Sequence, residues 1–353
     1  MGEPLQNTTI PTKQWSDPIE WEELGVFTDP SVKWELLAAC LGSIVFFLLQ
    51  FRLAQRYVPI ICRLISGDSN TYFQMAPKVQ AEYVSRVVSD IHSFFALAMS
   101  WYGCFYACED PTATIFNSFE CVMKPARIQK LVIAMSAGYC IYDTYICIVD
   151  IKFSWKEGFD FYLHHIISVA GALGVMVSGR FCIPVSAGNL VSEFSNAAMN
   201  LRWRFLKHKM YDHALFIPVS SIFMACFIAS RGVFMLMLLI RNYEVQRWHY
   251  DVTTEHPLIM IMTTTNTILQ AMLYGLQCFW LYILFRGFFR TILADKSQGN
   301  WIKKEEEALL KKQKEKAEQT KGGQEPQSVP AVQSPTDAKV DEAEKPLERK
   351  KED

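Results

Sequence analysis

Long apolar stretches alternate with short polar segments over most of the chain, and this pattern predicts helices that span a membrane. About 20 apolar residues in helical conformation cross the roughly 30 Å of hydrocarbon in a bilayer. Seven stretches approach or exceed this length, which predicts an all-α fold, a multi-pass transmembrane helical bundle. They lie at residues 34–51, 84–107, 131–149, 161–179, 183–201, 214–240 and 259–285. Six spans are the alternative, in which the fourth and fifth stretches form a re-entrant pair.

The two ends of the chain are polar and differ in composition from the rest. Residues 1–33 lack the basic region and following apolar run of a cleaved signal peptide, and the first span is expected at 34–52. Residues 296–353 hold 26 charged residues, whereas the 295 residues before them are about 15% charged. We therefore expect this last segment to be a charged and largely disordered tail.

The distribution of Lys and Arg predicts the orientation in the membrane. These residues concentrate in the first, third and fifth connections and at the start of the tail, which places the C-terminus in the cytosol and residues 1–33 in the lumen. Asn7-Thr8-Thr9 is a glycosylation sequon, which functions only on the lumenal side. Lys350-Lys351, followed by two residues, resembles a signal that retrieval coat proteins read. We expect a multi-pass protein of the endoplasmic reticulum membrane.

The charge balance and the cysteines exclude several classes of function. The net charge is −1, so the protein lacks the basic field that nucleic-acid binding requires. The ten cysteines include no Cys-x-x-Cys pair and no neighbouring His cluster at zinc spacing, so we expect no metal site. Cys108 and Cys121 both fall in a connection expected in the lumen and form the predicted disulfide, with Cys104 and Cys182 as alternatives.

Polar residues recur at helical spacing inside the expected spans. Asn189, Glu193, Asn196 and Asn200 follow one another at steps of four, three and four, and so share one helix face. Such residues are costly at membrane depth and usually face a cavity. The expected lining is Arg86, Asp90, His92, Ser168, Asn189, Ser192, Asn196, Asn200, Arg231, Asn266 and Gln270. Hydrogen bonds that only join helices are the alternative explanation.

Two adjacent histidines, His164 and His165, begin the fourth span. Neighbours on a helix point about 100° apart, so we expect one ring to face the cavity. Histidine titrates near neutral pH, and an inward ring could serve as a general base oriented by Glu193 or Asp143. These four residues are the candidate catalytic groups.

The stretch Phe161–Ser168, FYLHHIIS, resembles the His-His-x-x-Thr/Ser element of TLC-domain proteins. That family, of TRAM/LAG/CLN type, includes ceramide synthases, translocon-associated membrane proteins and smaller TLC-domain-containing proteins. Further similar elements follow the family's order, and the resemblance is to the smaller members. These elements are Glu82–Ser89 with His92-Ser93, Ser136–Tyr139 with Asp143, Ser192-Glu193, and Asn200–Trp203. The resemblance covers residues 80–290 and implies a core of six helices around a lipid-accessible cavity, preceded here by one extra span.

The resemblance implies two functions. In ceramide synthases the His pair is implicated in acyl transfer together with a downstream His-Asp-x-Ser-Asp element. At the matching place this chain reads Asn189–Glu193, NLVSE, which keeps the Ser but lacks the His and the first Asp. We therefore favour a protein without a cofactor that binds or handles membrane lipids and influences lipid homeostasis. The alternative is an acyltransferase with acyl-CoA as co-substrate, and an ion pathway along the same carboxylates ranks below both.

Overall fold

The computed structural model describes residues 30–293 except 69, 157, 179–181, 211 and 253–256. The sequon at Asn7, the dilysine Lys350-Lys351 and the charged tail at 296–353 lie outside the described residues. Within the described residues the secondary structure consists of helices alone. This confirms the all-α fold.

The helices follow the alternation of apolar and polar segments. They are α1 (Pro30–Ser66), α2 (Asn70–Gln74), α3 (Pro77–Phe105), α4 (Phe119–Met123), α5 (Arg127–Val149), α6 (Phe159–Ser178), α7 (Cys182–Gly188), the 3₁₀ helix η2 (Asn189–Ser195), α8 (Asn196–Lys207), α9 (Phe216–Phe227), the π-helix η3 (Ile228–Phe234), α10 (Met235–Val252) and α11 (Pro257–Leu293). Each of the seven expected spans falls on one long helix or on a run of consecutive helices.

Among the described residues, five helices or helix runs are long and apolar enough to cross a membrane. They correspond to α1, α5, α6, the run α9–η3–α10, and α11. The other two expected spans, α3 and the run α7–η2–α8, hold the charged and amide side chains that lower their hydropathy. Both pack against several other helices, which accounts for the tolerance of polar residues there.

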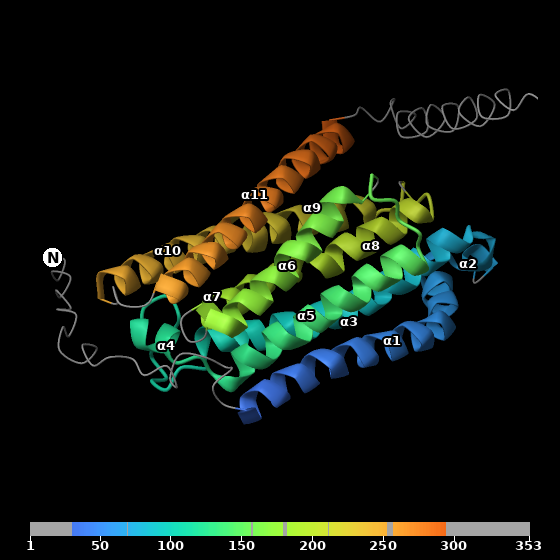
Figure 1. The fold of residues 1–353 in the computed structure, drawn as a ribbon. Helices are drawn as coiled ribbons and strands as arrows, with labels where there is room; N and C mark the ends of the chain where they lie inside the picture. The colour runs from blue at the N-terminus through green and yellow to red at the C-terminus, as the bar shows by residue number, and fades with distance from the viewer. Residues whose placement is uncertain are drawn as a thin grey trace, which may run out of the picture. The chain divides into compact units, whose positions relative to one another are not determined.

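The first helix is longer than its apolar stretch. The sequence predicts a span at 34–52, whereas α1 continues to Ser66 with Pro59 inside it. Figure 1 shows this helix bending near its C-terminal end. Proline removes a backbone hydrogen bond and kinks a helix, so Pro59 accounts for the bend.

The long helices of the bundle lie side by side, with α1 against α5 at one edge and α11 against α6 and α10 at the other (Figure 1). Gly138 allows the close approach of α1 to α5. A Cβ atom at this position would collide with the Cys40 carbonyl oxygen and would lie 2.9 Å from Ser43 Cβ. Ser43 Oγ also donates a hydrogen bond of 2.7 Å to the Met135 carbonyl oxygen.

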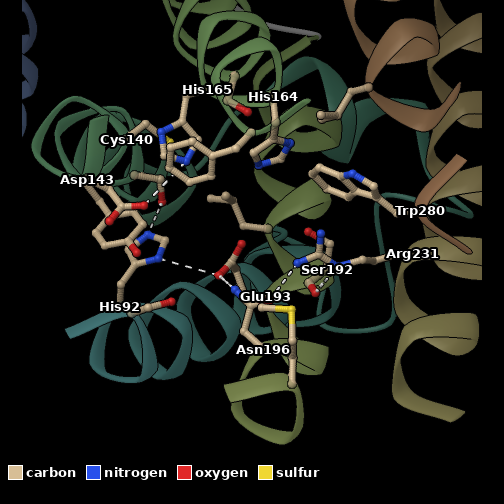
Figure 2. Close-up of a pocket in the computed structure, with 18 of the residues that line it drawn as sticks. His92, Cys140, Asp143, His164, His165, Ser192, Glu193, Asn196, Arg231 and Trp280 are labelled. Carbon is tan, nitrogen blue, oxygen red and sulfur yellow. Dashed lines mark hydrogen bonds and ion pairs between the residues drawn. The ribbon is translucent and has the colours of Figure 1, made fainter. Parts of the chain in front are cut away.

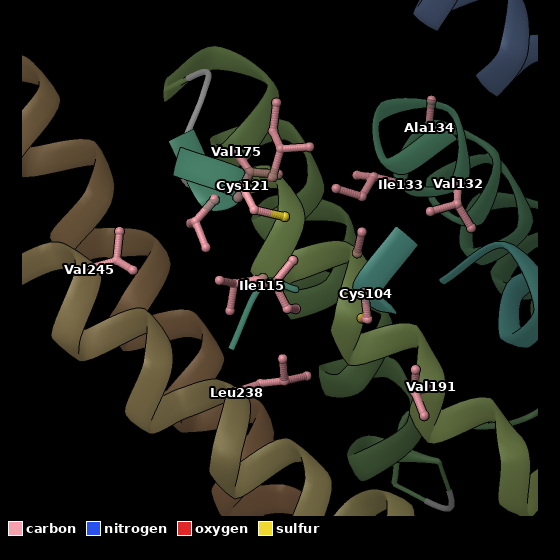
Figure 3. Packing of buried hydrophobic residues seen from close by; sticks show 14 of the residues in the cluster. Cys104, Ile115, Cys121, Val132, Ile133, Ala134, Val175, Val191, Leu238 and Val245 are labelled. Atoms are coloured by element: carbon pink, nitrogen blue, oxygen red, sulfur yellow. The ribbon is translucent and has the colours of Figure 1, made fainter. Parts of the chain in front are cut away.

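An apolar cluster near α4 is formed by residues of α3, α5, α7 and α10, among other segments (Figure 3). Cys104, Ile115, Val132 and Leu238 are almost completely buried there. The neighbouring Cys108 forms a disulfide with Cys121, with a Cα–Cα distance of 5.2 Å. Cys104, one of the alternatives for this disulfide, is a buried free thiol.

Two irregular helical segments pack against each other in the middle of the bundle. The 3₁₀ helix η2 interrupts the run from α7 to α8, and the π-helix η3 interrupts the run from α9 to α10. Such segments change the direction of side chains relative to a regular α-helix and often occur at functional sites. Here they carry Glu193 and Arg231, respectively.

Candidate functional site

A cavity of about 700 Å³ lies inside the bundle, lined by residues of α3, α5, α6, α7, η2, α8, α9, η3 and α11. Figure 2 shows the His164 and His165 side chains of α6 and the Glu193 side chain of η2 directed into it. The four candidate catalytic residues line it: His164, His165, Glu193 and Asp143. So do all but one of the other expected residues: Arg86, His92, Ser168, Asn189, Ser192, Asn196, Asn200, Arg231, Asn266 and Gln270.

His165 is buried and lies beside Asp143. Its Nε2 atom is 3.7 Å from Asp143 Oδ2, and its Nδ1 atom is 2.9 Å from Thr144 Oγ1. Asp143 also accepts a hydrogen bond of 3.0 Å from Ser85 Oγ. Asp143 and Thr144 both belong to α5, so α5 orients the ring of His165 on α6.

His164 points to the other side of the cavity. Its ring centroid lies 5.6 Å from that of His165 and 5.5 Å from that of Trp280 on α11. Its Nδ1 atom is buried and has no hydrogen-bond partner among the described residues. Both histidines therefore reach the cavity, whereas the sequence predicted one.

Glu193 is the second buried carboxylate of the cavity. It accepts hydrogen bonds from Ser93 Oγ at 2.8 Å and from Asn196 Nδ2 at 2.6 Å. Its Oε2 atom lies 3.7 Å from Nδ1 of His92, whose ring stacks on Tyr139 with centroids 3.7 Å apart. The sequence left open which carboxylate orients the His pair. In the structure Asp143 lies beside it, and Glu193 instead pairs with His92.

Arg231 joins three helical segments from inside the bundle. Its Nε atom donates to the Ser192 carbonyl oxygen at 3.2 Å and to Ser195 Oγ at 3.0 Å. Its Nη1 and Nη2 atoms donate to Gln277 Oε1 at 2.9 Å and to Asn196 Oδ1 at 2.7 Å. The Asn196 amide thus links the buried Arg231 guanidinium to the Glu193 carboxylate. The negative charge of Glu193 compensates the positive charge of Arg231 through this amide.

Asp90 does not line the cavity, which corrects the expectation from the sequence. Its carboxylate accepts a hydrogen bond of 2.6 Å from Asn200 and forms an ion pair with Arg204, both on α8. Arg86, one turn earlier, pairs with Glu82 at 2.9 Å and donates to Asn200 at 3.0 Å. The packing of α8 on α3 supplies these partners, and Asp90 joins the two helices.

Several polar atoms at the cavity have no partner among the described residues. Gln270 Nε2 donates to Asn189 Oδ1 at 3.2 Å, but Gln270 Oε1, Asn266 Nδ2 and His164 Nδ1 make no hydrogen bond. A buried polar atom without a partner costs roughly 1–3 kcal/mol. These atoms could be satisfied by the polar group of a bound molecule.

Sequence reasoning missed several residues that shape the site. Thr144 and Ser85 orient the His165–Asp143 pair, and Trp280 donates a hydrogen bond of 2.7 Å to Asp160 beside His164. Arg202 also lines the cavity. Thr144 directly follows Asp143 and Arg202 lies in the Asn200–Trp203 element, so both were adjacent to recognised signals. Among the described residues, no three His, Cys, Asp or Glu side chains gather as metal ligands.

Comparison with known proteins identifies a family domain over the same part of the chain. The sequence pattern of the TLC domain matches residues 82–286, which include every residue that lines the cavity. TLC domain-containing protein 4 C of Dictyostelium discoideum is 24% identical over 259 residues, covering 70% of this chain and 87% of that protein. No solved structure matches the chain at a comparable level. The resemblance seen in the sequence is confirmed, and the chain belongs to the TLC domain family.

Proposed function

We propose that this multi-pass membrane protein binds a membrane lipid in its cavity and thereby influences lipid homeostasis. The cavity supports this proposal, because its volume of about 700 Å³ falls within the roughly 300–1,000 Å³ usual for small-molecule sites. Its wall is mixed: Phe223, Phe227 and Leu273 are apolar, whereas Asn266 and Gln270 offer unpaired polar atoms. A molecule with an acyl chain and a polar head matches both kinds of wall.

Helix α6 offers a matched pair of variants for testing lipid binding. A Cβ atom at Gly171, which lines the cavity, or at Gly174, which does not, would meet nothing within 4 Å. Gly171→Phe should fill part of the cavity and reduce lipid co-purifying with the detergent-solubilised protein, as measured by mass spectrometry. Gly174→Phe should leave it unchanged. Equal lipid content in both variants and in the wild type would reject binding in this cavity.

We propose that the protein resides in the endoplasmic reticulum membrane with a lumenal N-terminus and a cytosolic C-terminus. The Lys and Arg distribution supports this orientation. The disulfide between Cys108 and Cys121 also favours a lumenal position for the α3–α5 connection. A C-terminal tag should be digested by protease added to sealed microsomes, and Asn7 should be glycosylated. Protection of the tag would overturn the orientation.

A second candidate function is acyl transfer from acyl-CoA, favoured by the 3.7 Å distance between His165 Nε2 and Asp143 Oδ2. In this reaction His165 would take the proton of an amine or hydroxyl as its nitrogen or oxygen attacks the thioester carbonyl. The C–S bond would break, and the proton would pass to the departing thiolate of CoA. Asp143 would stabilise the imidazolium formed in between.

Lipidomics distinguishes the two functions. Membranes containing the wild type should differ in lipid composition from membranes containing the double variant His164→Ala/His165→Ala. Purified protein is then supplied with acyl-CoA and lipid amines or alcohols. An altered profile without transfer supports lipid handling alone, transfer abolished in the double variant supports the enzyme, and an unchanged profile with no transfer rejects both.

A further inference from the structure

Four cations and two carboxylates lie within residues 82–90 of α3 and residues 200–207 of α8. The carboxylates are both engaged: Glu82 pairs with Arg86 at 2.9 Å and lies 4.0 Å from Lys207 Nζ, and Asp90 pairs with Arg204. The fourth cation, Arg202, has no carboxylate within 4 Å among the described residues.

Arg202 is half-buried in the wall of the cavity. Its described contact is with an aromatic ring: the guanidinium carbon lies 5.9 Å from the centroid of Phe216, the first residue of α9. The five N–H donors of the guanidinium therefore have no acceptor in the described part of the chain. Arg231, which also lines the cavity, is in contrast hydrogen-bonded at all three nitrogens.

We infer that Arg202 binds a phosphate group of the molecule that occupies the cavity. This inference rests on the proposed lipid-binding function and adds the chemical class of the polar head. A planar guanidinium presents two parallel N–H groups that match phosphate oxygens, and the partial positive charge of the adjacent α9 N-terminus acts in the same direction. The phosphate belongs either to a lipid headgroup or to the CoA part of acyl-CoA.

Two photoreactive probes that differ only in the phosphate test this inference. Phosphatidic acid and diacylglycerol carry the same diazirine acyl chain and are added to full-length protein in an uncharged, phosphate-free detergent. In the wild type, phosphatidic acid should label peptides of the cavity helices about tenfold more strongly, the ratio expected from one charge-assisted hydrogen-bonding contact. Arg202→Gln should bring the ratio to about one, and Arg202→Lys, which keeps the charge, should retain part of it.

Three controls make the result decisive. Lys124→Gln removes an exposed cation outside the cavity and should keep the wild-type ratio. Gly171→Phe should reduce labelling by both probes. Excess CoA that abolishes labelling by phosphatidic acid would assign the phosphate to acyl-CoA, and labelling that resists CoA would assign it to a headgroup.

The failure of the inference differs from the failure of the proposed function. Equal labelling by both probes in the wild type, still reduced by Gly171→Phe, would overturn the role of Arg202 and leave lipid binding intact. A ratio of ten that persists in Arg202→Gln would also overturn it. Labelling that maps outside the cavity and ignores Gly171→Phe would overturn both.

Discussion

The Nε2 atom of His165 lies 3.7 Å from the Asp143 carboxylate, and the contacts of the Nδ1 atom assign the lone pair of the ring to Nε2. The hydroxyl of Thr144 lies 2.7 Å from the Cys140 carbonyl oxygen, which can only accept, so the hydroxyl hydrogen is used there. Thr144 Oγ1 must then accept from Nδ1–H of His165 at 2.9 Å. A neutral imidazole carries one N–H, which leaves Nε2 free to take up a proton beside a carboxylate that would stabilise the resulting charge.

Thr144→Val should change the tautomer of His165. Without the hydroxyl oxygen, Nδ1–H loses its acceptor at 2.9 Å, whereas a proton on Nε2 would face the Asp143 carboxylate, so the Nε2–H tautomer should be favoured. Nitrogen NMR of ¹⁵N-histidine-labelled protein should show Nδ1–H in the wild type and Nε2–H in the variant, with His165→Gln identifying the signal. If the protein catalyses acyl transfer, loss of the base should lower the rate about 10²-fold. Thr144→Ser keeps the oxygen, and a changed tautomer there would contradict the argument.

Gly138→Ala should destabilise the bundle by pushing α1 away from α5. The added methyl group would meet the Cys40 carbonyl oxygen, and backbone cannot move aside as a flexible side chain can. Overpacking of this kind costs about 1–3 kcal/mol. Gly42→Ala, on α1 in open space, is the matched control and should leave thermal unfolding in detergent unchanged or slightly raised. Equal unfolding temperatures for the two variants would show that the contact is not tight.

Loss of the Cys108–Cys121 disulfide should weaken the connection between α3 and α5. The bond closes a loop with a sequence separation of 13, for which chain entropy predicts about 3 kcal/mol of stabilisation. The double variant Cys108→Ser/Cys121→Ser should unfold at a lower temperature, and reducing agent should lower only that of the wild type. Cys278→Ser, at an exposed free thiol, serves as the control. Alkylation of Cys108 or Cys121 in unreduced, folded protein would disprove the bond.

Helical spacing predicted which residues line the cavity better than it predicted which of their side chains contact one another. All four polar residues of the η2–α8 face line the cavity: Asn189, Glu193, Asn196 and Asn200. Polar side chains at membrane depth are costly against lipid, so they face the interior of the bundle. The partners were not predictable, since the contact of Glu193 with His92 depends on how two distant segments pack. Spacing within a single helix also cannot reveal 3₁₀ or π segments, which arise from tertiary packing.

Acidification should destabilise the protein through His208, which follows directly on α8. Burial lowers the pKa of this ring below its usual value near 6.5, and Tyr83 Oη lies 3.2 Å from its Nε2 atom. Below a pH of about 6.5 the His208 ring binds a proton in the unfolded chain but not in the folded protein, so the free energy of unfolding falls as the pH decreases. Above this pH the ring is neutral in both states, and its contribution to stability is constant. The unfolding temperature should therefore drop between pH 7 and pH 5.5, and less steeply in His208→Gln. Identical slopes would exclude this contribution.

Arg231→Met should be the most destabilising of these changes, although it removes a buried charge from the membrane interior. The substitution leaves the Ser192 carbonyl, Asn196 and Gln277 without their donor and the nearby Glu193 without a compensating cation. Breaking a buried charged network costs about 3–5 kcal/mol, or roughly 6 °C or more in unfolding temperature for a domain of this size.

Arg231→Lys tests whether charge or geometry matters in this network. A lysine keeps the cation near Glu193, but its single ammonium group cannot reach acceptors on η2, α8 and α11 together. We therefore expect an intermediate loss of unfolding temperature. Arg127→Gln, which removes an exposed arginine paired with Glu35, should change stability by no more than about 0.5 kcal/mol. If Arg231→Lys matches the wild type, charge compensation alone holds η2, α8 and α11 around the cavity, and the hydrogen bonds of the guanidinium are dispensable.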